Sequence, residues 1–161
     1  VPYSVAGKTR TVVQAEYQGG KTPELALPVA DAAPAVFTLD SSGRGPGAIL
    51  NQDYSVNTPA SRAAKGSIIQ IFATGEGQTN PPGVDGKVAI GGLPSPILLV
   101  SVTIGGLDAP VKYAGAAPGM VAGLIQVNAE VPGNVASGSA VPVVLTFGDN
   151  PSPRGVTVAI R

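Results

Sequence analysis

The sequence predicts an all-β protein built as an antiparallel β-sandwich, and three observations support this. Three C-terminal stretches (124–131, 141–147 and 155–160) alternate in polarity or are rich in β-branched residues, and Gly, Pro and Asn clusters separate them. The 22 Gly and 16 Pro residues lie between apolar runs, which is typical of short strands joined by tight turns. Hydrophobic residues make up 43% of the chain but aromatic residues only 4%, so we expect a core of Val, Ile, Leu and Ala.

Charge and missing residue types limit the classes of function. The chain of 161 residues carries 10 basic and 10 acidic side chains, so it offers no basic face for phosphates and we expect no nucleic-acid partner. Cys and His are absent, which removes disulfides, thiolate nucleophiles, zinc clusters and the commonest general base. No segment reaches the roughly 18 uninterrupted apolar residues of a membrane helix, so we expect no membrane span.

Residues 1–30 repeat the pattern of residues 131–160. Both segments contain Val-Pro-x-x-Val-Ala, a polar turn, a strand ending in an aromatic residue (Tyr17, Phe147), a second turn and a last strand. With a constant offset of 130 (131 − 1) they are identical at Val1/Val131, Pro2/Pro132, Val5/Val135, Ala6/Ala136, Val13/Val143 and Pro23/Pro153. The repeat predicts that residues 1–30 form a β-hairpin equivalent to the C-terminal one.

The two copies differ in what precedes them. A strand at 124–131 leads into the second copy, and the first copy has no such strand before it. Because an isolated two-stranded hairpin is only marginally stable, we expect residues 1–30 to dock on their own domain, on a removed N-terminal portion or on another chain. The start at Val1, without Met, favours a processed or excised chain.

The stretches between the two hairpins are expected to form a linker and the body of the sandwich. Residues 31–39, which include Pro34, are expected to be an extended and stiff linker, with the sandwich over 40–161. Apolar runs typical of buried strands occur at Ser67–Ala73 and Ile97–Ile104. Shorter strands are expected at 48–50, 54–56 and 109–113, one helical turn after Pro59, and the longest loop at 74–87.

Several segments together resemble a known family. They are PAVFTLDSSGRGPGAILNQDYSVN, IFATGEGQTNPPGVDG, SVTIGG, VKYAG, APGMVAGLIQVNAEVP, SGSAVPVVLTFG and GVTVAIR. Together they resemble the uncharacterised C-terminal domain repeated across secreted acidobacterial proteins, and the back half resembles the immunoglobulin-like (IPT/TIG-type) sandwiches. The resemblance implies an Ig-like antiparallel β-sandwich and an extracellular or cell-surface location. It implies no activity and assigns no functional residue.

Three carboxylates near Gly-rich loops, Glu76, Asp85 and Asp53, are candidates for an acid–base pair of the glycosidase kind. Asp85 precedes Gly86 and Asp53 lies in a similar context, so a role in turns is the favoured interpretation. Residues 51–55 place side-chain oxygens at alternate positions, as a calcium loop does, but they lack the Gly and the bidentate Glu of an EF-hand. A structural turn is favoured there, with calcium binding as the alternative.

The remaining candidates point to chemistry more weakly. Gly75–Gly77 is not followed by the Lys-Ser/Thr of a phosphate-binding loop, and Ser61 and Lys65 do not have S-x-x-K spacing. The four tyrosines (Tyr3, Tyr17, Tyr54 and Tyr113) are scattered, which favours packing over a sugar-stacking platform. We therefore assign no catalytic, metal-binding or cofactor-binding residue.

The expected function is that of a non-catalytic structural module in an extracellular or cell-surface assembly. The module would associate with itself through residues 1–30 by strand or hairpin addition, and a head-to-tail contact of this kind extends into a filament. The alternative is a carbohydrate- or protein-binding accessory domain of a larger secreted protein, with the loop 74–87 as its contact surface. An enzyme is the least favoured class, because Asp, Glu, Lys, Ser or Tyr would have to act without His or Cys.

Overall fold

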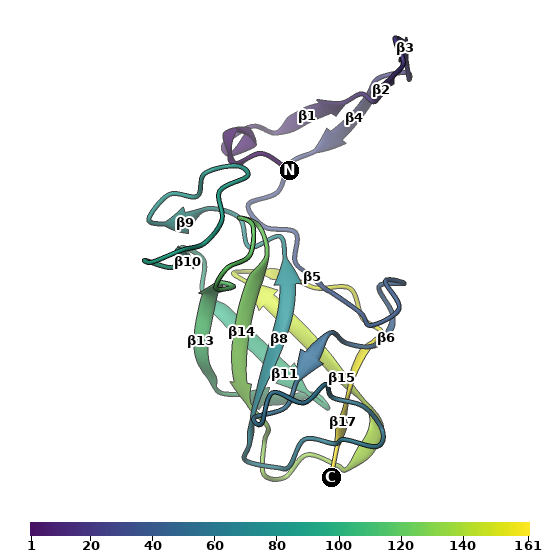
Figure 1. The fold of residues 1–161 in the computed structure, drawn as a ribbon, viewed down its shortest axis with the longest axis vertical. Helices are drawn as coiled ribbons and strands as arrows, with labels where there is room; N and C mark the ends of the chain where they lie inside the picture. The colour runs from purple at the N-terminus through teal and green to yellow at the C-terminus, as the bar shows by residue number, and fades with distance from the viewer.

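The computed structural model describes residues 1–161 and shows an all-β protein with two sheets packed face to face as a β-sandwich (Figure 1). The five-stranded sheet has the order β13 (Val111–Ala116), β14 (Ile125–Glu130), β8 (Ile68–Thr74) and β5 (Ala35–Val36), and β7 (Ile49–Leu50) also pairs with β8. The six-stranded sheet has the order β12 (Leu107–Ala109), β11 (Val100–Ile104), β15 (Gly138–Phe147), β17 (Val156–Ile160) and β6 (Gly45–Pro46), and β16 (Asn150–Pro151) also pairs with β15. The short strands β9 (Thr79–Asn80) and β10 (Ser95–Pro96) form a separate pair.

The core lies between the two sheets and is almost entirely aliphatic, as the composition predicts. The inward side chains of β8 and β14, such as Ile71 and Val127, are fully buried against Val143, Leu145 and Phe147 of β15. Phe147 is the only buried aromatic side chain. Burial alternates strictly along β8 and β14, which is the period expected of strands with one face in a core.

The stretches with the clearest patterns form strands. The strands expected at 67–73, 97–104, 124–131, 141–147 and 155–160 appear as β8, β11, β14, β15 and β17. The strand expected at 109–113 is interrupted at Pro110, whose ring nitrogen cannot donate a ladder hydrogen bond. As a result β12 belongs to one sheet and β13 to the other.

Two of the weaker expectations were wrong. Residues 54–56 form no strand, although Val56 makes a single bridge to Leu50. No helical turn follows Pro59. Thr58 and Ser61 exchange backbone hydrogen bonds, and Ala63 then bonds to the backbone of Ala159 and Arg161, which draws this stretch out along β17.

Residues 31–39, expected as a linker, contribute a strand to the sandwich. Ala35 and Val36 form β5, which pairs antiparallel with Thr74 and Ala73 of β8. Ala32 and Val36 belong to the buried core. The stretch is therefore extended, as Pro34 suggests, but it packs on the five-stranded sheet.

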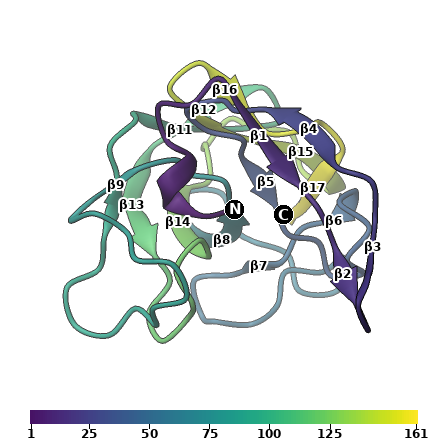
Figure 2. The same ribbon diagram turned by 90° about the horizontal axis from the view of Figure 1, so that it is seen from above.

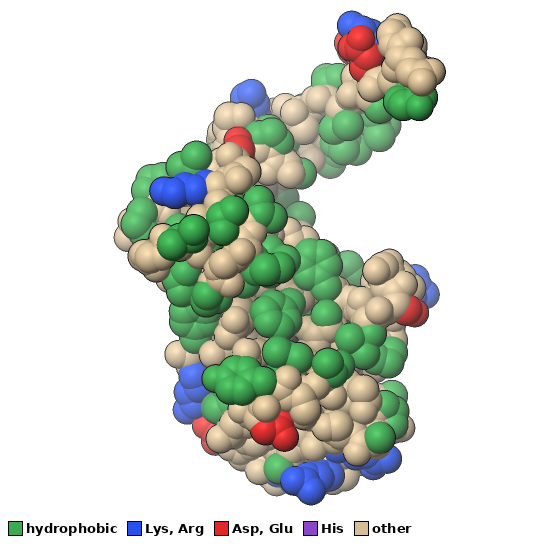
Figure 3. All heavy atoms as spheres, in the orientation of Figure 1, with side chains coloured by type: hydrophobic (Ala, Val, Ile, Leu, Met, Phe, Trp, Pro, Cys, Tyr) green, Lys and Arg blue, Asp and Glu red, His purple; other side chains and the backbone are tan.

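Residues 1–30 form the predicted hairpin, which projects from one end of the sandwich (Figures 1 and 2). A short 3-10 helix, η1 (Tyr3–Val5), precedes β1 (Arg10–Val13), which pairs with β4 (Leu25–Pro28). At the tip, β2 (Glu16–Tyr17) pairs with β3 (Gly20–Lys21). None of these strands pairs with either sheet of the sandwich. Figure 3 shows hydrophobic side chains along the arm of the hairpin and charged ones at its tip.

Phe147 and Tyr17 occupy equivalent places in the two hairpins. Replacing each of them with alanine therefore tests the difference in packing between the two hairpins. We expect Phe147→Ala to lower the free energy of unfolding by about 3–5 kcal/mol, because it opens a cavity in the core. We expect Tyr17→Ala to change it by no more than about 0.5 kcal/mol, because Tyr17 is exposed. Urea unfolding measures both values, and similar losses for the two variants would contradict the exposed position of the hairpin.

Candidate functional site: the junction between the hairpin and the sandwich

Polar contacts join the start of the chain to the loop 74–87. The Tyr3 hydroxyl donates to Oε1 of Glu76 at 3.1 Å, and the Tyr3 backbone N–H donates to Oδ1 of Asp85 at 2.9 Å. Nε2 of Gln78 donates to the Tyr3 carbonyl oxygen at 3.2 Å. These contacts span more than 70 residues of sequence and fix η1 on the loop.

Two glycines let the connecting chain approach the same loop closely. Gly75 and Gly77 have φ values of +83° and +77°, in the left-handed region that glycine adopts without strain. A Cβ atom at Gly75 would collide with the carbonyl oxygen of Ala33, and one at Gly77 with that of Asp31. The Ala33 N–H also donates to the Gly75 carbonyl oxygen at 2.9 Å. The Gly-Glu-Gly segment is thus a backbone docking site for residues 31–33.

The side chain of Tyr3 packs closely against the loop 74–87. Its ring occupies the space that a Cβ atom on Gly83 would need. Partial burial, the charge of Glu76 and the hydrogen bond to Glu76 together raise the pKa of Tyr3 to about 12. The phenol donates its hydrogen bond to the side chain of Glu76, which is only 3% exposed.

The three candidate carboxylates do not form one site. Glu76 and Asp85 are both engaged by Tyr3, whereas Asp53 lies near Arg161 at the end of the sandwich opposite the hairpin (Figure 1). Asp53 accepts hydrogen bonds from the Ser55 hydroxyl at 2.6 Å and the Ser55 N–H at 3.0 Å, and these bonds lower its pKa. They close a local Asx-type turn, in agreement with the turn interpretation.

The other candidate residues also serve structural roles. The Ser61 hydroxyl bonds with Asn51 and Ser55, and it makes no bond to Lys65. The tyrosines are dispersed as expected: Tyr17 and Tyr54 are exposed, and the Tyr113 hydroxyl donates to the Ala116 carbonyl oxygen at 2.8 Å.

Sequence reasoning missed a buried amide, Asn57, that ties a loop to β17. Its Nδ2 donates to Oδ1 of Asn51 at 2.8 Å and to the Ala159 carbonyl oxygen at 2.9 Å, and its Oδ1 accepts from the Ala159 N–H at 2.7 Å. These bonds satisfy the polar atoms of a side chain that is only 4% exposed. Asn57 follows no motif, and its partner lies 102 residues away, so local pattern could not identify it.

A groove of about 800 Å³ runs beside the junction, between residues 1–8 and the sandwich. Most of its lining is apolar and includes Val5, Phe37, Ile97 and Val121. No group of three or more acidic, His or Cys side chains comes together in the structure to hold a metal ion. The structure contains no helix with the length and hydrophobicity that a membrane span requires.

Comparison of the chain with protein-family models, with curated proteins and with solved structures finds no match. The geometry of the site is that of a structural junction, in which the polar side chains of the loop 74–87 hold the base of the hairpin.

Replacement of the docking glycines tests the close approach. We expect Gly77→Ala to destabilise the protein by at least about 1 kcal/mol more than Gly86→Ala, because the added methyl group collides with the backbone of Asp31. Gly86 is the matched control, since it has a φ of +74° and nothing within 4 Å of a Cβ atom. Both variants pay the cost of a left-handed alanine, about 1–2 kcal/mol. Equal unfolding free energies in urea would show that residues 31–33 do not need to lie so close to this loop.

The raised pKa of Tyr3 predicts a pH dependence of the docked junction. Because the docked phenol holds its proton up to a pKa of about 12, docking is fully stabilised below the ordinary tyrosine pKa of 10.0 and weakens as the pH rises from there through 12. Absorbance titration of phenolate should show a late step, to which Tyr113 also contributes because burial raises its pKa. Tyr3→Phe should reduce the size of this late step, and Tyr17→Phe should retain it in full. Loss of that step in the Tyr17→Phe control would contradict the assignment.

Proposed function

We propose that the chain is a non-catalytic structural module of an extracellular or cell-surface assembly, joined to its neighbours by β-strand or hairpin addition through residues 1–30. One observation carries the proposal: a complete hairpin stands clear of the sandwich with both outer strand edges unpaired. Such edges offer rows of N–H and C=O groups to another chain. The immunoglobulin-like class and the exported location rest on the family resemblance.

The side chains of the hairpin support a docking role. Val12, Val13 and Leu25 are each more than half exposed, and Leu27 is 39% exposed. Val13 faces Leu25 across the β1–β4 pair and Thr11 faces Leu27, so one face of the arm is mostly apolar. Covering this face would remove apolar surface from water, at about 25 cal/mol per Å².

The junction and the charge of the chain favour the same role. Tyr3 and the close approach at Gly75 and Gly77 hold the base of the hairpin on the sandwich, so less conformational freedom is lost when the hairpin docks. The net charge of zero gives weak repulsion between copies. A contact from the hairpin of one copy to the sandwich of the next is head-to-tail, and such contacts extend into filaments when the rotation does not close.

The alternative, a carbohydrate- or protein-binding accessory domain, receives less support. It would use the loop 74–87, but Glu76, Gln78 and Asp85 in that loop are already engaged by Tyr3. The two acidic side chains of this loop are thus already hydrogen-bonded within the chain. Binding on a glycan array that depends on this loop would favour the alternative.

Self-association provides the test of the structural proposal. We expect the apparent mass in sedimentation experiments to rise with protein concentration, and the double variant Val13→Lys/Leu25→Lys to lower the association at least tenfold, because it places two charges on the apolar face. Val56→Lys is the control, since Val56 is exposed on the sandwich and outside the hairpin. A protein that stays monomeric at high concentration, or one that associates equally well with the charged hairpin, would refute the proposal.

A further inference from the structure

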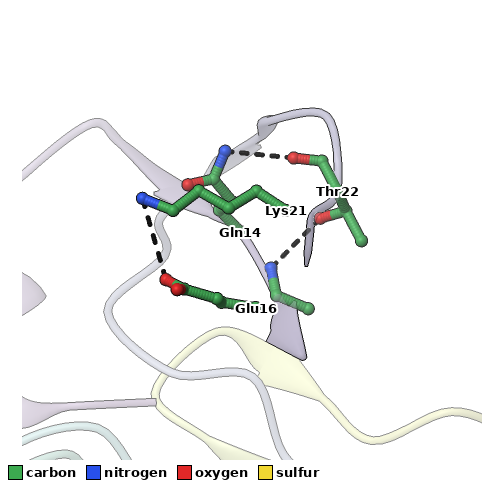
Figure 4. A network of polar contacts seen from close by, with 5 residues as sticks. Gln14, Glu16, Lys21 and Thr22 are labelled. Atoms are coloured by element: carbon green, nitrogen blue, oxygen red, sulfur yellow. Dashed lines mark hydrogen bonds and ion pairs between the residues drawn. The ribbon is translucent and has the colours of Figure 1, made fainter. Parts of the chain in front are cut away.

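The hairpin of residues 1–30 reproduces the C-terminal hairpin in its hydrogen bonds. At the base, the Val5 N–H donates to Pro2 at 3.3 Å, as the Val135 N–H does to Pro132 at 3.3 Å. Near the tip, the Ala15 N–H donates to the Thr22 hydroxyl at 3.1 Å (Figure 4), as the Leu145 N–H does to the Ser152 hydroxyl at 3.1 Å. The reciprocal bonds, Thr22 N–H to Ala15 and Ser152 N–H to Leu145, measure 2.9 and 2.7 Å.

The strand register repeats as well. At the tip, Tyr17 pairs with Gly20 as Phe147 pairs with Asn150, which keeps the offset of 130. In the arms, Thr11 pairs with Leu27 as Val141 pairs with Val158, which gives offsets of 130 (141 − 11) and 131 (158 − 27). The second copy therefore holds one extra residue between its tip and its last strand. The gapless alignment of the two sequences is off by one over β4.

With this register, the two hairpins present equivalent side chains on one face. The register gives the pairs Thr11/Val141, Val13/Val143, Tyr17/Phe147, Leu25/Val156 and Leu27/Val158. The shared hydrogen bonds add Ala15/Leu145, and the offset of 131 extends to Val29/Ile160. Six of the seven N-terminal members are Val, Ala, Tyr or Leu, and the larger Leu25 and Leu27 only partly offset the volume missing at Ala15 and Val29. A face that is apolar at six of seven positions has the composition of a core face.

The equivalent faces differ sharply in exposure. Val13 is 51% exposed and Val143 0%, and Leu25 is 59% exposed and Val156 2%. In the C-terminal copy the face is covered by β8 and β14, and the outer edge of β15 pairs with β11. In the N-terminal copy no strand takes either place.

We infer that residues 1–30 are the terminal hairpin of a second β-sandwich of the same architecture, and that their partner is a sandwich body built like residues 31–130 and lacking a terminal hairpin of its own. This body would place an antiparallel strand along β1 and β2, as β11 lies along β15. Its opposing sheet would cover Val13, Tyr17, Leu25 and Leu27. The body within this chain cannot serve, because β15 and β17 already fill it.

The inference deepens the proposed function, because it names the partner that the hairpin fits and rests on the hairpin being a docking element. It also distinguishes two ways in which a partner could cover the apolar face of the hairpin. Copies of the chain bring bodies that are already filled, so they can cover the hairpin only from outside a core. A body without a hairpin of its own would instead bury the apolar face in a hydrophobic core that it shares with the hairpin.

A fusion protein tests the inference. Residues 31–130 are joined directly ahead of Val1 of the full chain, so that the added body leads into Val1 as Glu130 leads into Val131. We expect the amides of β1 and β4 to exchange with solvent at least a hundredfold more slowly than in the unfused chain, and the added body to resist protease. Because Ala15 stands where this body accommodates Leu145, the Ala15→Leu variant of the fusion should be protected more strongly still.

Val13→Asp in the fusion is the discriminating variant. It should expose the added body to protease and return the amides of β1 and β4 to the exchange rates of the unfused chain, while the sandwich of residues 31–161 stays folded. If β1 and β4 remain unprotected in both the original and the Ala15→Leu fusions, or if Val13→Asp leaves the protection unchanged, the inference is overturned.

The result is separable from that of the self-association experiment. Protection in the fusion without association of the unfused chain would refute copy-to-copy assembly and support the inference. Association of the unfused chain without protection in the fusion would support copy-to-copy assembly and overturn the inference. When both hold, the fusion should associate less than the unfused chain, because its added body covers the apolar face.

Discussion

The insertion of β15 between β11 and β17, with its inner face buried against β8 and β14, is the interaction on which the sandwich depends. β15 is the longest strand, and it pairs with β11, β16 and β17. Val143, Leu145 and Phe147 from this strand are fully buried, and each buried side chain of this size contributes about 1.5–3 kcal/mol. A hairpin with the same hydrogen bonds occurs at the start of the chain, where the equivalent face is open to water. One molecule therefore contains this hairpin twice, once buried against an opposing sheet and once exposed.

The junction explains residues that resemble a catalytic or phosphate-binding loop. A Gly-Glu-Gly segment with a nearby Asp invites a chemical interpretation, but the glycines admit a backbone, Glu76 accepts a hydrogen bond from Tyr3, and Asp85 accepts one from the adjoining N–H. A buried carboxylate needs such partners. The acidic residues of this loop thus fix one segment of the chain to another.

The sequence predicted the strands with a strong local pattern and missed what depends on distant partners. β8, β14, β15 and β17 were predictable because a buried face imposes alternation or a run of β-branched residues. The role of Tyr3 at Glu76 and the burial of Asn57 were not, since each depends on contacts more than 70 residues away. The repeat itself was visible, but the shared Pro23/Pro153 favoured a gapless alignment. Only the pairing of Leu27 and Val158 reveals the one-residue offset in the last strand.

The close packing of Asp31 and Ala33 on Gly77 and Gly75 also sets a direction in space. A flexible linker would let a neighbouring unit adopt many orientations, whereas backbone packed directly against backbone restricts its orientation. A partner that covered the arm would then lie at a fixed angle to the sandwich beneath it. A row of such units would then advance by a constant rise and rotation, with the pitch of the row set by two glycines.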